Sequence, residues 1–161
     1  MSGAVRIRDA DLSRDRPSFV GFIMGSQLFE HAFEPNRRLD PPVAEEHLVK
    51  MLDAVATRPG RIFVAEDDEA TLGWGIVFEM QDDVYVVAAE RRAAFIAELF
   101  VAEAARGRGV GRALIAACEA WALGRGIGVM HMGVLPGNTR ARAIYDTAGY
   151  AAYSLQLRKY L

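Results

Sequence analysis

Glycine and arginine alternate over residues 106–112, directly before an apolar, alanine-rich run. The segment reads RGRGVGR, with three glycines and three arginines. Glycine has no Cβ and lets a backbone approach a ligand closely, and arginine donates charge-assisted hydrogen bonds to phosphate oxygens. The first N–H groups of a following helix have no partner within the helix, and the helix dipole adds positive charge there. The segment predicts a phosphate or pyrophosphate site, with a glycine-rich turn carrying solvated arginines as the alternative.

Two known phosphate-binding patterns do not fit this segment. A Walker loop needs lysine after its last glycine, and Arg112 occupies that position. The dinucleotide pattern G-x-G-x-x-G requires its last glycine one position later than Gly111. The pattern that matches is R-x-x-G-x-G, formed by Arg106, Gly109 and Gly111. It follows the run ELFV at residues 98–101, which is typical of a β-strand.

Apolar periodicity and turn residues predict the elements that position this segment. The expected strands cover residues 5–8, 61–67, 71–80, 94–102, 127–135 and 150–161, with the stretch 81–93 part strand and part loop. The expected helices run from a cap at Ser13 to about Phe33, over 43–57, from the glycine-rich segment onward, and between a cap at Asn138 and Gly149. Antiparallel strands followed by strand–helix–strand units predict a mixed α/β layer architecture.

Composition narrows the class of protein. A chain of 161 residues predicts one domain over residues 1–161, and the net charge of -2 gives no positive field for nucleic acid or an anionic membrane. The single cysteine, Cys118, excludes an internal disulfide and fits a reducing compartment. The N-terminal region has no signal-peptide pattern, and no apolar run approaches the ~18 residues of a membrane span. We therefore expect a cytoplasmic protein.

Residues 97–114 (AELFVAEAARGRGVGRAL) and 138–150 (NTRARAIYDTAGY) together resemble the GNAT superfamily of N-acetyltransferases. In that family the first block forms the acetyl-CoA pyrophosphate site. The second, N-x-x-A-x-x-x-Y-x-x-x-G-[FY], supplies a cofactor-contacting asparagine and a tyrosine near the thiol, here Asn138 and Tyr145. The resemblance is specific over roughly residues 93–161. It implies an α/β fold with a mixed, mostly antiparallel central sheet flanked by helices on both faces.

The resemblance also implies which residues hold acetyl-CoA. The backbone N–H of Val101 matches the family's donor to the oxyanion of the tetrahedral intermediate. Arg142 either reaches the coenzyme phosphates or lies in solvent. The full implied set is Leu99, Phe100, Val101, Arg106, Gly107, Arg108, Gly109, Val110, Gly111, Arg112, Asn138, Arg142 and Tyr145.

The implied reaction is direct attack of an amine on acetyl-CoA in a ternary complex. An alkyl ammonium with a pKa near 10.4 costs about 4.6 kcal/mol to deprotonate at pH 7, so a base is needed. Glu98 is the candidate, acting directly or through an ordered water. Strand alternation places Glu98 and Phe100 on one face; the alternative is a solvent-facing or salt-bridged glutamate. Tyr145 matches the family's general acid, and the alternative is a buried helix tyrosine.

The acceptor is predicted to be the primary amine of a small molecule, but its class stays open. Phe29 and Phe33 can wall a pocket, and Glu30 and Asp83 can attract a cationic diamine or polyamine. Four arginines favour instead an acid-bearing acceptor such as an amino acid: Arg37, Arg38, Arg91 and Arg92. The histidines, at 31, 47 and 131, show no metal-ligand spacing, so no metal is expected.

Two alternative functions are compatible with the same motifs. A protein lysine or N-terminal acetyltransferase would need an open groove in place of a closed pocket. A non-catalytic CoA-binding sensor would be favoured by loss of Tyr145 or Asn138, and both residues are present. Family members often pair, so a homodimer is expected.

Overall fold

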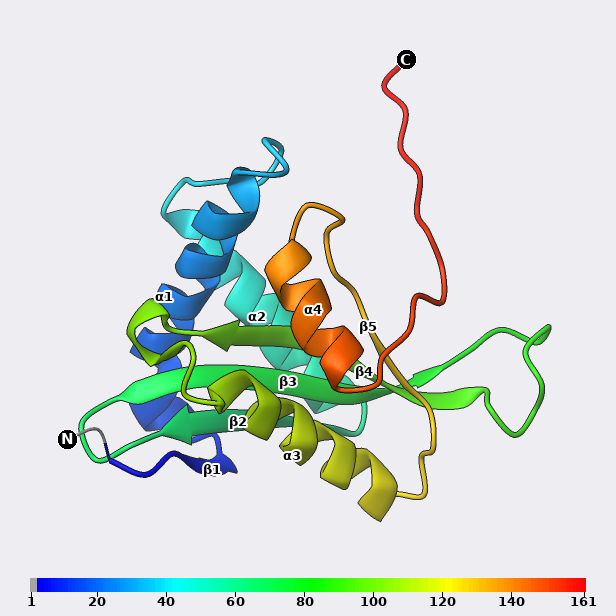
Figure 1. Cartoon of the computed structure of the whole chain (residues 1–161), viewed down its shortest axis with the longest axis horizontal. Coiled ribbons are helices and arrows are strands. Elements are labelled where there is room, and N and C mark those ends of the chain that lie inside the picture. Colours follow the sequence, from blue (N-terminus) through cyan, green and yellow to red (C-terminus); the bar gives the residue numbers. More distant parts are fainter. Residues whose placement is uncertain (1–2) are drawn as a thin grey trace.

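The computed structural model describes residues 3–161 and contains a five-stranded sheet of order β1-β2-β3-β4-β5 (Figure 1). The strands are β1 (Arg6–Asp9), β2 (Gly60–Glu66), β3 (Thr71–Gln81), β4 (Arg92–Val101) and β5 (Met130–Met132). The helices are α1 (Leu12–His31), α2 (Pro42–Thr57), α3 (Val110–Gly124) and α4 (Thr139–Thr147), with a short 3-10 turn at Glu103–Ala105. The first four strands pair antiparallel, and β5 pairs with β4 in parallel. This confirms the expected mixed, mostly antiparallel sheet.

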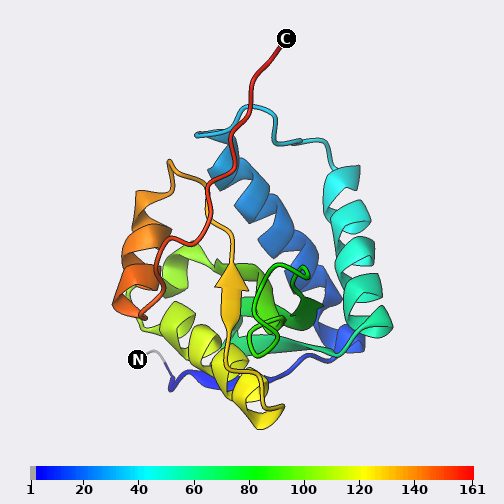
Figure 2. The same ribbon diagram turned by 90° about the vertical axis from the view of Figure 1, so that its right-hand side faces the viewer.

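Helices cover both faces of the sheet, as the turned view shows (Figure 2). The core on the α1 and α2 side is built around Trp74 of β3, whose ring stacks on Phe19 of α1 with centroids 4.5 Å apart. On the other face, α3 buries Leu114 and Cys118 against the sheet. The sheet is therefore fixed from both sides, and its strand ends can hold a site.

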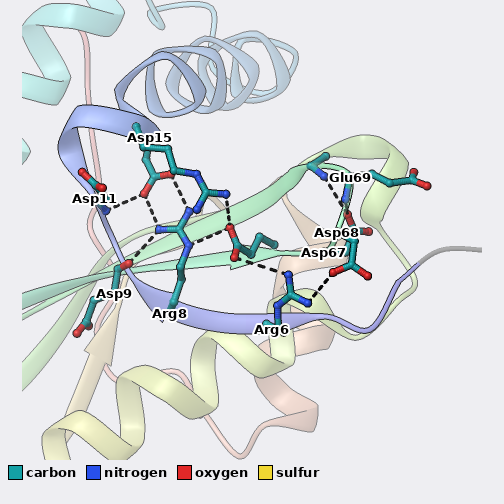
Figure 3. Close-up of polar contacts among 11 residues, drawn as sticks. Arg6, Arg8, Asp9, Asp11, Asp15, Asp67, Asp68 and Glu69 are labelled. Atoms are coloured by element: carbon teal, nitrogen blue, oxygen red, sulfur yellow. Dashed lines mark hydrogen bonds and ion pairs between the residues drawn. The ribbon is translucent and has the colours of Figure 1, made fainter.

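Charged side chains tie β1 to the start of α1 and the end of β2 (Figure 3). Arg8 donates two hydrogen bonds to Asp15, at 2.7 and 2.8 Å, and Asp15 is only 1% exposed. The backbone N–H of Asp11 donates a further bond to the Asp15 carboxylate at 2.8 Å. Arg8 also contacts Glu66 of β2 at 2.9 Å. A buried carboxylate with this many donors keeps its charge, because each donor favours the ionised form.

The first helix begins earlier than the cap expected at Ser13. Asp11 is its N-cap, and its carboxylate accepts a hydrogen bond from the Ser13 backbone N–H at 3.0 Å. Ser13 lies inside the first turn, so its assignment as the cap was wrong. Aspartate and serine both serve as caps, and the sequence places them within three positions of one another.

One residue of β4 has no partner on β3. Glu98 pairs with Ile76 and Ile96 pairs with Val77, so Ala97 forms a β-bulge. Ile96 packs on the α3 side, whereas Ala97 packs on the α1 and α2 side. The extra residue shifts the alternation, so Glu98 and Phe100 both face α1 and α2. The expected grouping of Glu98 with Phe100 is confirmed, although an uninterrupted strand would have placed Glu98 on the other face.

The predicted strand over residues 150–161 is absent, which corrects the expectation. Residues 150–161 have no regular secondary structure (Figure 1) and contact the body through Tyr153 on His131 of β5 and through Arg158 with Glu34 at 2.6 Å. Their alternating apolar side chains stay in solvent, with Tyr153 71%, Leu155 75% and Leu157 83% exposed. Alternation alone favours an extended chain, but a strand needs a neighbour to satisfy its backbone.

Two other expected strands are shorter than predicted. The expected strand at 127–135 is reduced to β5, which pairs only with Ala94–Ile96 of β4. The ambiguous stretch 81–93 is mainly a loop between β3 and β4. Within residues 3–161, no helix is both long and apolar enough to cross a membrane.

Candidate active site

A cavity of about 840 Å³ lies among the C-terminal half of β4, the starts of α3 and α4, and the end of α1. It exists because β4 and β5 separate: their pairing stops at Ile96 and Met132, while β4 continues to Val101. Residues 97–101 of β4 consequently line the cavity with no β5 residue paired to them. The predicted cofactor residues Leu99, Phe100 and Val101 belong to this segment.

The glycine-rich segment forms one wall of the cavity. Gly107 and Gly109 both have φ of +80°, a left-handed backbone that favours glycine. No side chain caps the N-terminus of α3, which starts at Val110. A Cβ at Gly107 or Gly109 would meet no atom within 4 Å, so the space beside the loop is open. Free amides beside open space fit an anion such as a pyrophosphate.

The four arginines proposed for the phosphates lie in different places. Arg106 and Arg112 line the cavity, together with Arg140, while Arg108 and Arg142 do not. The Arg108 side chain instead donates to Asp67 at 2.8 Å and to the Gly3 carbonyl at 3.1 Å. The structure therefore places Arg106, Arg112 and Arg140 at the cavity, whereas Arg108 tethers the loop to Asp67.

Glu98 reaches into the cavity and is paired with a histidine that sequence reasoning missed. The Nε2 atom of His47, on α2, lies 2.5 Å from Glu98 Oε1, and both residues line the cavity. The hydrogen bond from Glu98 raises the pKa of the His47 imidazole, and partial burial opposes this shift. The two residues are separated by 51 positions in the chain, so spacing gives no sign of the pair.

Helix α4 brings Tyr145 and Asn138 to the cavity. Asn138 caps the helix: its Oδ1 accepts a hydrogen bond from the Ala141 N–H at 3.1 Å, as expected. Burial raises the pKa of the Tyr145 phenol, and the nearby charge of Glu30 adds to the effect. Tyr145 therefore carries its proton at neutral pH and can act as a donor.

The predicted acceptor residues are only partly brought together. Phe29 and Glu30 line the cavity, and Phe33 and Asp83 do not. Phe33 packs edge-on against Phe29, with ring centroids 5.1 Å apart, and supports that wall from behind. Asp83 lies in the β3–β4 loop, where its carboxylate accepts from the Val84 N–H at 2.6 Å. Asp83 is thus a turn residue, because its carboxylate stabilises its own loop.

At the end of the cavity predicted to hold the acceptor, the charged side chains are paired in salt bridges. Glu30 pairs with Arg37 at 2.6 Å. Arg38 is held by Asp40 and Glu46, at 2.5 and 2.6 Å. Residues 3–161 contain no cluster of three or more His, Cys, Asp or Glu side chains suited to a metal ion.

Solved structures of acetyltransferases share this fold. A putative acetyl transferase from Pyrococcus furiosus aligns over 98% of this chain and 100% of its own, with a TM-score of 0.74 and 23% identity. The aminoglycoside N-acetyltransferase AAC(6')-Iy, in complex with CoA, aligns over 99% and 97%, with a TM-score of 0.65 and 21% identity. A mutant of the BH1408 protein from Bacillus halodurans also aligns, over 97% and 99%, with a TM-score of 0.80 and 19% identity. No curated protein matches the chain significantly.

The fold places the chain in the α/β class to which these acetyltransferase structures belong. The model of the acetyltransferase (GNAT) family matches residues 26–150, which is most of the chain. The chain therefore belongs to the GNAT family of acetyltransferases, enzymes that use acetyl-CoA. The resemblance read from residues 97–114 and 138–150 is confirmed.

Proposed function

We propose that this enzyme transfers an acetyl group from acetyl-CoA to the primary amine of a small, cationic molecule. The observation that carries the proposal is one shared cavity, lined both by the anion-binding loop and by Glu98 and Tyr145. Bound acetyl-CoA supplies an activated acetyl group. The loop from Gly107 to Gly111, with Arg106 and Arg112, would hold its pyrophosphate.

The backbone of Val101 is suited to stabilise negative charge on the acetyl oxygen. The Arg106 side chain donates to the Val101 carbonyl at 3.3 Å, so this carbonyl points away from β3. In an extended strand the N–H of a residue points to the same side as its C=O. The Val101 N–H is therefore directed to the side of β4 that faces the cavity, which supports its assignment as the oxyanion donor.

Glu98 and Tyr145 would handle the two proton transfers. Glu98 accepts a proton from the acceptor ammonium, directly or through a water, and leaves a nucleophilic nitrogen. Tyr145 donates a hydrogen bond or a proton to the departing sulfur. Its raised pKa makes complete transfer to a thiolate unfavourable, so hydrogen bonding is its larger contribution.

The charges at the acceptor end favour a cationic amine over an acid-bearing acceptor. Arg37 and Arg38 are both bound to carboxylates, which leaves them little charge to offer a substrate anion. Glu98 also has a partner, His47, but a neutral imidazole leaves the negative charge of the carboxylate facing the cavity. Phe29 adds an aromatic wall beside it.

A library of primary amines, assayed by release of free thiol from acetyl-CoA, tests the function. Cys118 does not interfere, because burial raises the pKa of its thiol to about 12. Turnover with diamines and none with amino acids is expected.

A thermal melt tests cofactor binding separately. Acetyl-CoA should raise the Tm, and Gly109→Trp should abolish that increase by filling the loop. A wild-type protein with no shift at millimolar acetyl-CoA would refute the assignment.

We also propose that the chain pairs as a homodimer through residues 150–161. Their apolar side chains alternate and are exposed, and strand β5 beside them has no further partner within residues 3–161. Such a segment is stabilised by adding to a sheet edge. Light scattering should give twice the monomer mass, and truncation after Ala152 should give the monomer; a monomeric full chain would contradict this.

A further inference from the structure

His47 and Glu98 form a partly buried, hydrogen-bonded pair inside the cavity, unlike a contact between two exposed surface side chains. Helix α2 projects His47 toward the sheet, and the bulge at Ala97 turns Glu98 to the same face. The carboxylate is mostly shielded, with 16% of the Glu98 side chain exposed, against 35% for His47. Within residues 3–161, His47 is the one hydrogen-bond partner of the Glu98 side chain. The other carboxylate oxygen is left for a ligand in the cavity.

We propose that His47 is a positioning residue that holds Glu98 toward the acceptor nitrogen and, by its own protonation, switches acetyl transfer off in acid. This inference rests on the proposed function. When His47 is neutral, it donates its Nε2–H to Glu98 Oε1 and leaves the carboxylate negative. When it is protonated, the imidazolium cancels that negative charge. Glu98 then attracts the acceptor ammonium less, and the imidazolium N–H competes for the carboxylate that would accept the amine proton.

The proton steps balance with His47 unchanged. The ammonium of the acceptor gives one proton to Glu98, and the electron pair of that N–H bond becomes the lone pair of the nitrogen. This lone pair forms the C–N bond to the acetyl carbon, and the C–S bond breaks. Tyr145 donates a hydrogen bond to the departing sulfur, and the proton lost by the nitrogen of the new amide passes to that sulfur, so Tyr145 keeps its own proton. Glu98 releases its proton to solvent, so each turnover releases one proton.

The charges that face His47 come from three elements. Glu98 on β4 raises its pKa most, and Glu30 on α1 raises it further. Lys50, on α2 itself, lowers it, as does burial. The two carboxylates outweigh burial and Lys50, so the pKa of the His47 imidazole lies above that of an ordinary histidine. Acid inactivation should therefore follow the titration of His47 and begin at a higher pH than an unpaired histidine would give.

The substitution His47→Gln separates positioning from titration, because glutamine keeps an N–H donor and has no charge to gain. The measurement is kcat/KM for one amine in both proteins, taken as the ratio of variant to wild type at each pH. This ratio cancels the titration of the amine itself. The ratio should be constant at high pH and rise as the pH falls below the His47 pKa, by up to about tenfold per unit. His31→Gln, a histidine outside the cavity, is the matched control and should give a flat ratio.

A second measurement stands apart from activity. NMR titration of the histidines should show that Glu98→Gln lowers the His47 pKa, because the substitution removes the carboxylate that raises it. A pH-independent ratio for His47→Gln in an active enzyme, or a His47 pKa indifferent to Glu98→Gln, would overturn the proposal. If wild-type protein neither binds acetyl-CoA nor releases thiol, the proposed function fails instead, and the NMR result still decides whether the two residues are coupled.

Discussion

Arg108 and Asp67 form an ion pair of 2.8 Å between the glycine-rich loop and the turn that follows β2. Asp67 is 7% exposed, and its other carboxylate oxygen accepts from the N–H groups of Glu69 and Ala70, each at 3.0 Å. The bond from Arg108 lowers the pKa of Asp67, and the two backbone bonds act in the same direction. The loop is thus anchored on the side away from the cavity, which fixes its amides before a ligand arrives.

This arrangement predicts different outcomes for two neighbouring arginines. Arg112→Gln should weaken acetyl-CoA binding by about tenfold or more, because a charge-assisted hydrogen bond contributes about 1.5–3 kcal/mol. Arg108→Gln should lower the Tm and change the Kd by less than about threefold. Isothermal titration calorimetry and thermal melts on both variants distinguish the roles. Equal loss of affinity in the two would show that Arg108 binds the coenzyme directly.

Tyr145→Phe tests the proton donor. The substitution keeps the ring and removes only the hydroxyl, so packing of α4 should persist. We expect kcat to fall by about 100-fold, the lower range for a positioned acid or base, with the Kd of acetyl-CoA unchanged. Steady-state kinetics with a direct binding measurement checks this. Normal turnover in this variant would show that Tyr145 has only a structural role.

Gly109→Ala tests the backbone of the loop. With φ at +80°, an alanine there should cost about 1–2 kcal/mol and displace the amides that face the cavity. We expect a Tm lower by about 3–6 °C and weaker binding of acetyl-CoA. Gly124→Ala is the matched control: it ends α3 without a positive φ and has open space around it. That variant should be neutral or slightly stabilised.

Asp15→Asn tests the buried ion pair with Arg8. The substitution should destabilise the fold by about 2 kcal/mol at pH 7, because the donors from Arg8 and the Asp11 N–H lose a buried carboxylate acceptor while Glu66 still pairs with Arg8. The bonds from Arg8 lower the pKa of Asp15 against the opposing effect of burial. The wild-type advantage should therefore be complete above about pH 5 and shrink as the pH falls below about 4. Urea unfolding of both proteins across this range measures it; an advantage that does not decline between pH 5 and pH 2 would contradict the assignment.

The features predicted correctly from the sequence are those carried by contiguous residues. The loop from Arg106 to Arg112 and the cap at Asn138 depend on neighbours a few positions away, and the structure places both as expected except for the Arg108 side chain, which lies outside the cavity. Tyr145 follows from Asn138, because the spacing along α4 brings both to the cavity. Local spacing also identified α3, whose apolar face repeats with the helical period.

The features that sequence reasoning missed depend on contacts between distant segments. His47 acquires its role only when α2 packs against β4, 51 positions further along the chain. The sequence predicts Arg108 as a phosphate ligand, because its partner Asp67 lies 41 positions away in the chain and becomes its neighbour only on folding. The terminal segment has the alternation of a strand, yet the fold places it where no strand pairs with it. Periodicity reports how a side chain can be oriented, and not which neighbour it meets.

The single unpaired residue at Ala97 divides β4 into two halves that are out of phase. If Ala97 were instead paired with β3, alternation would run unbroken from Ile96, and every later side chain of β4 would turn to the opposite surface. Glu98 would then be directed into the apolar layer beneath α3, and Leu99 would take its place opposite His47. The capacity for proton transfer thus depends on one irregularity of pairing as well as on composition: the same residues in a regular strand would keep the sheet and lose the base.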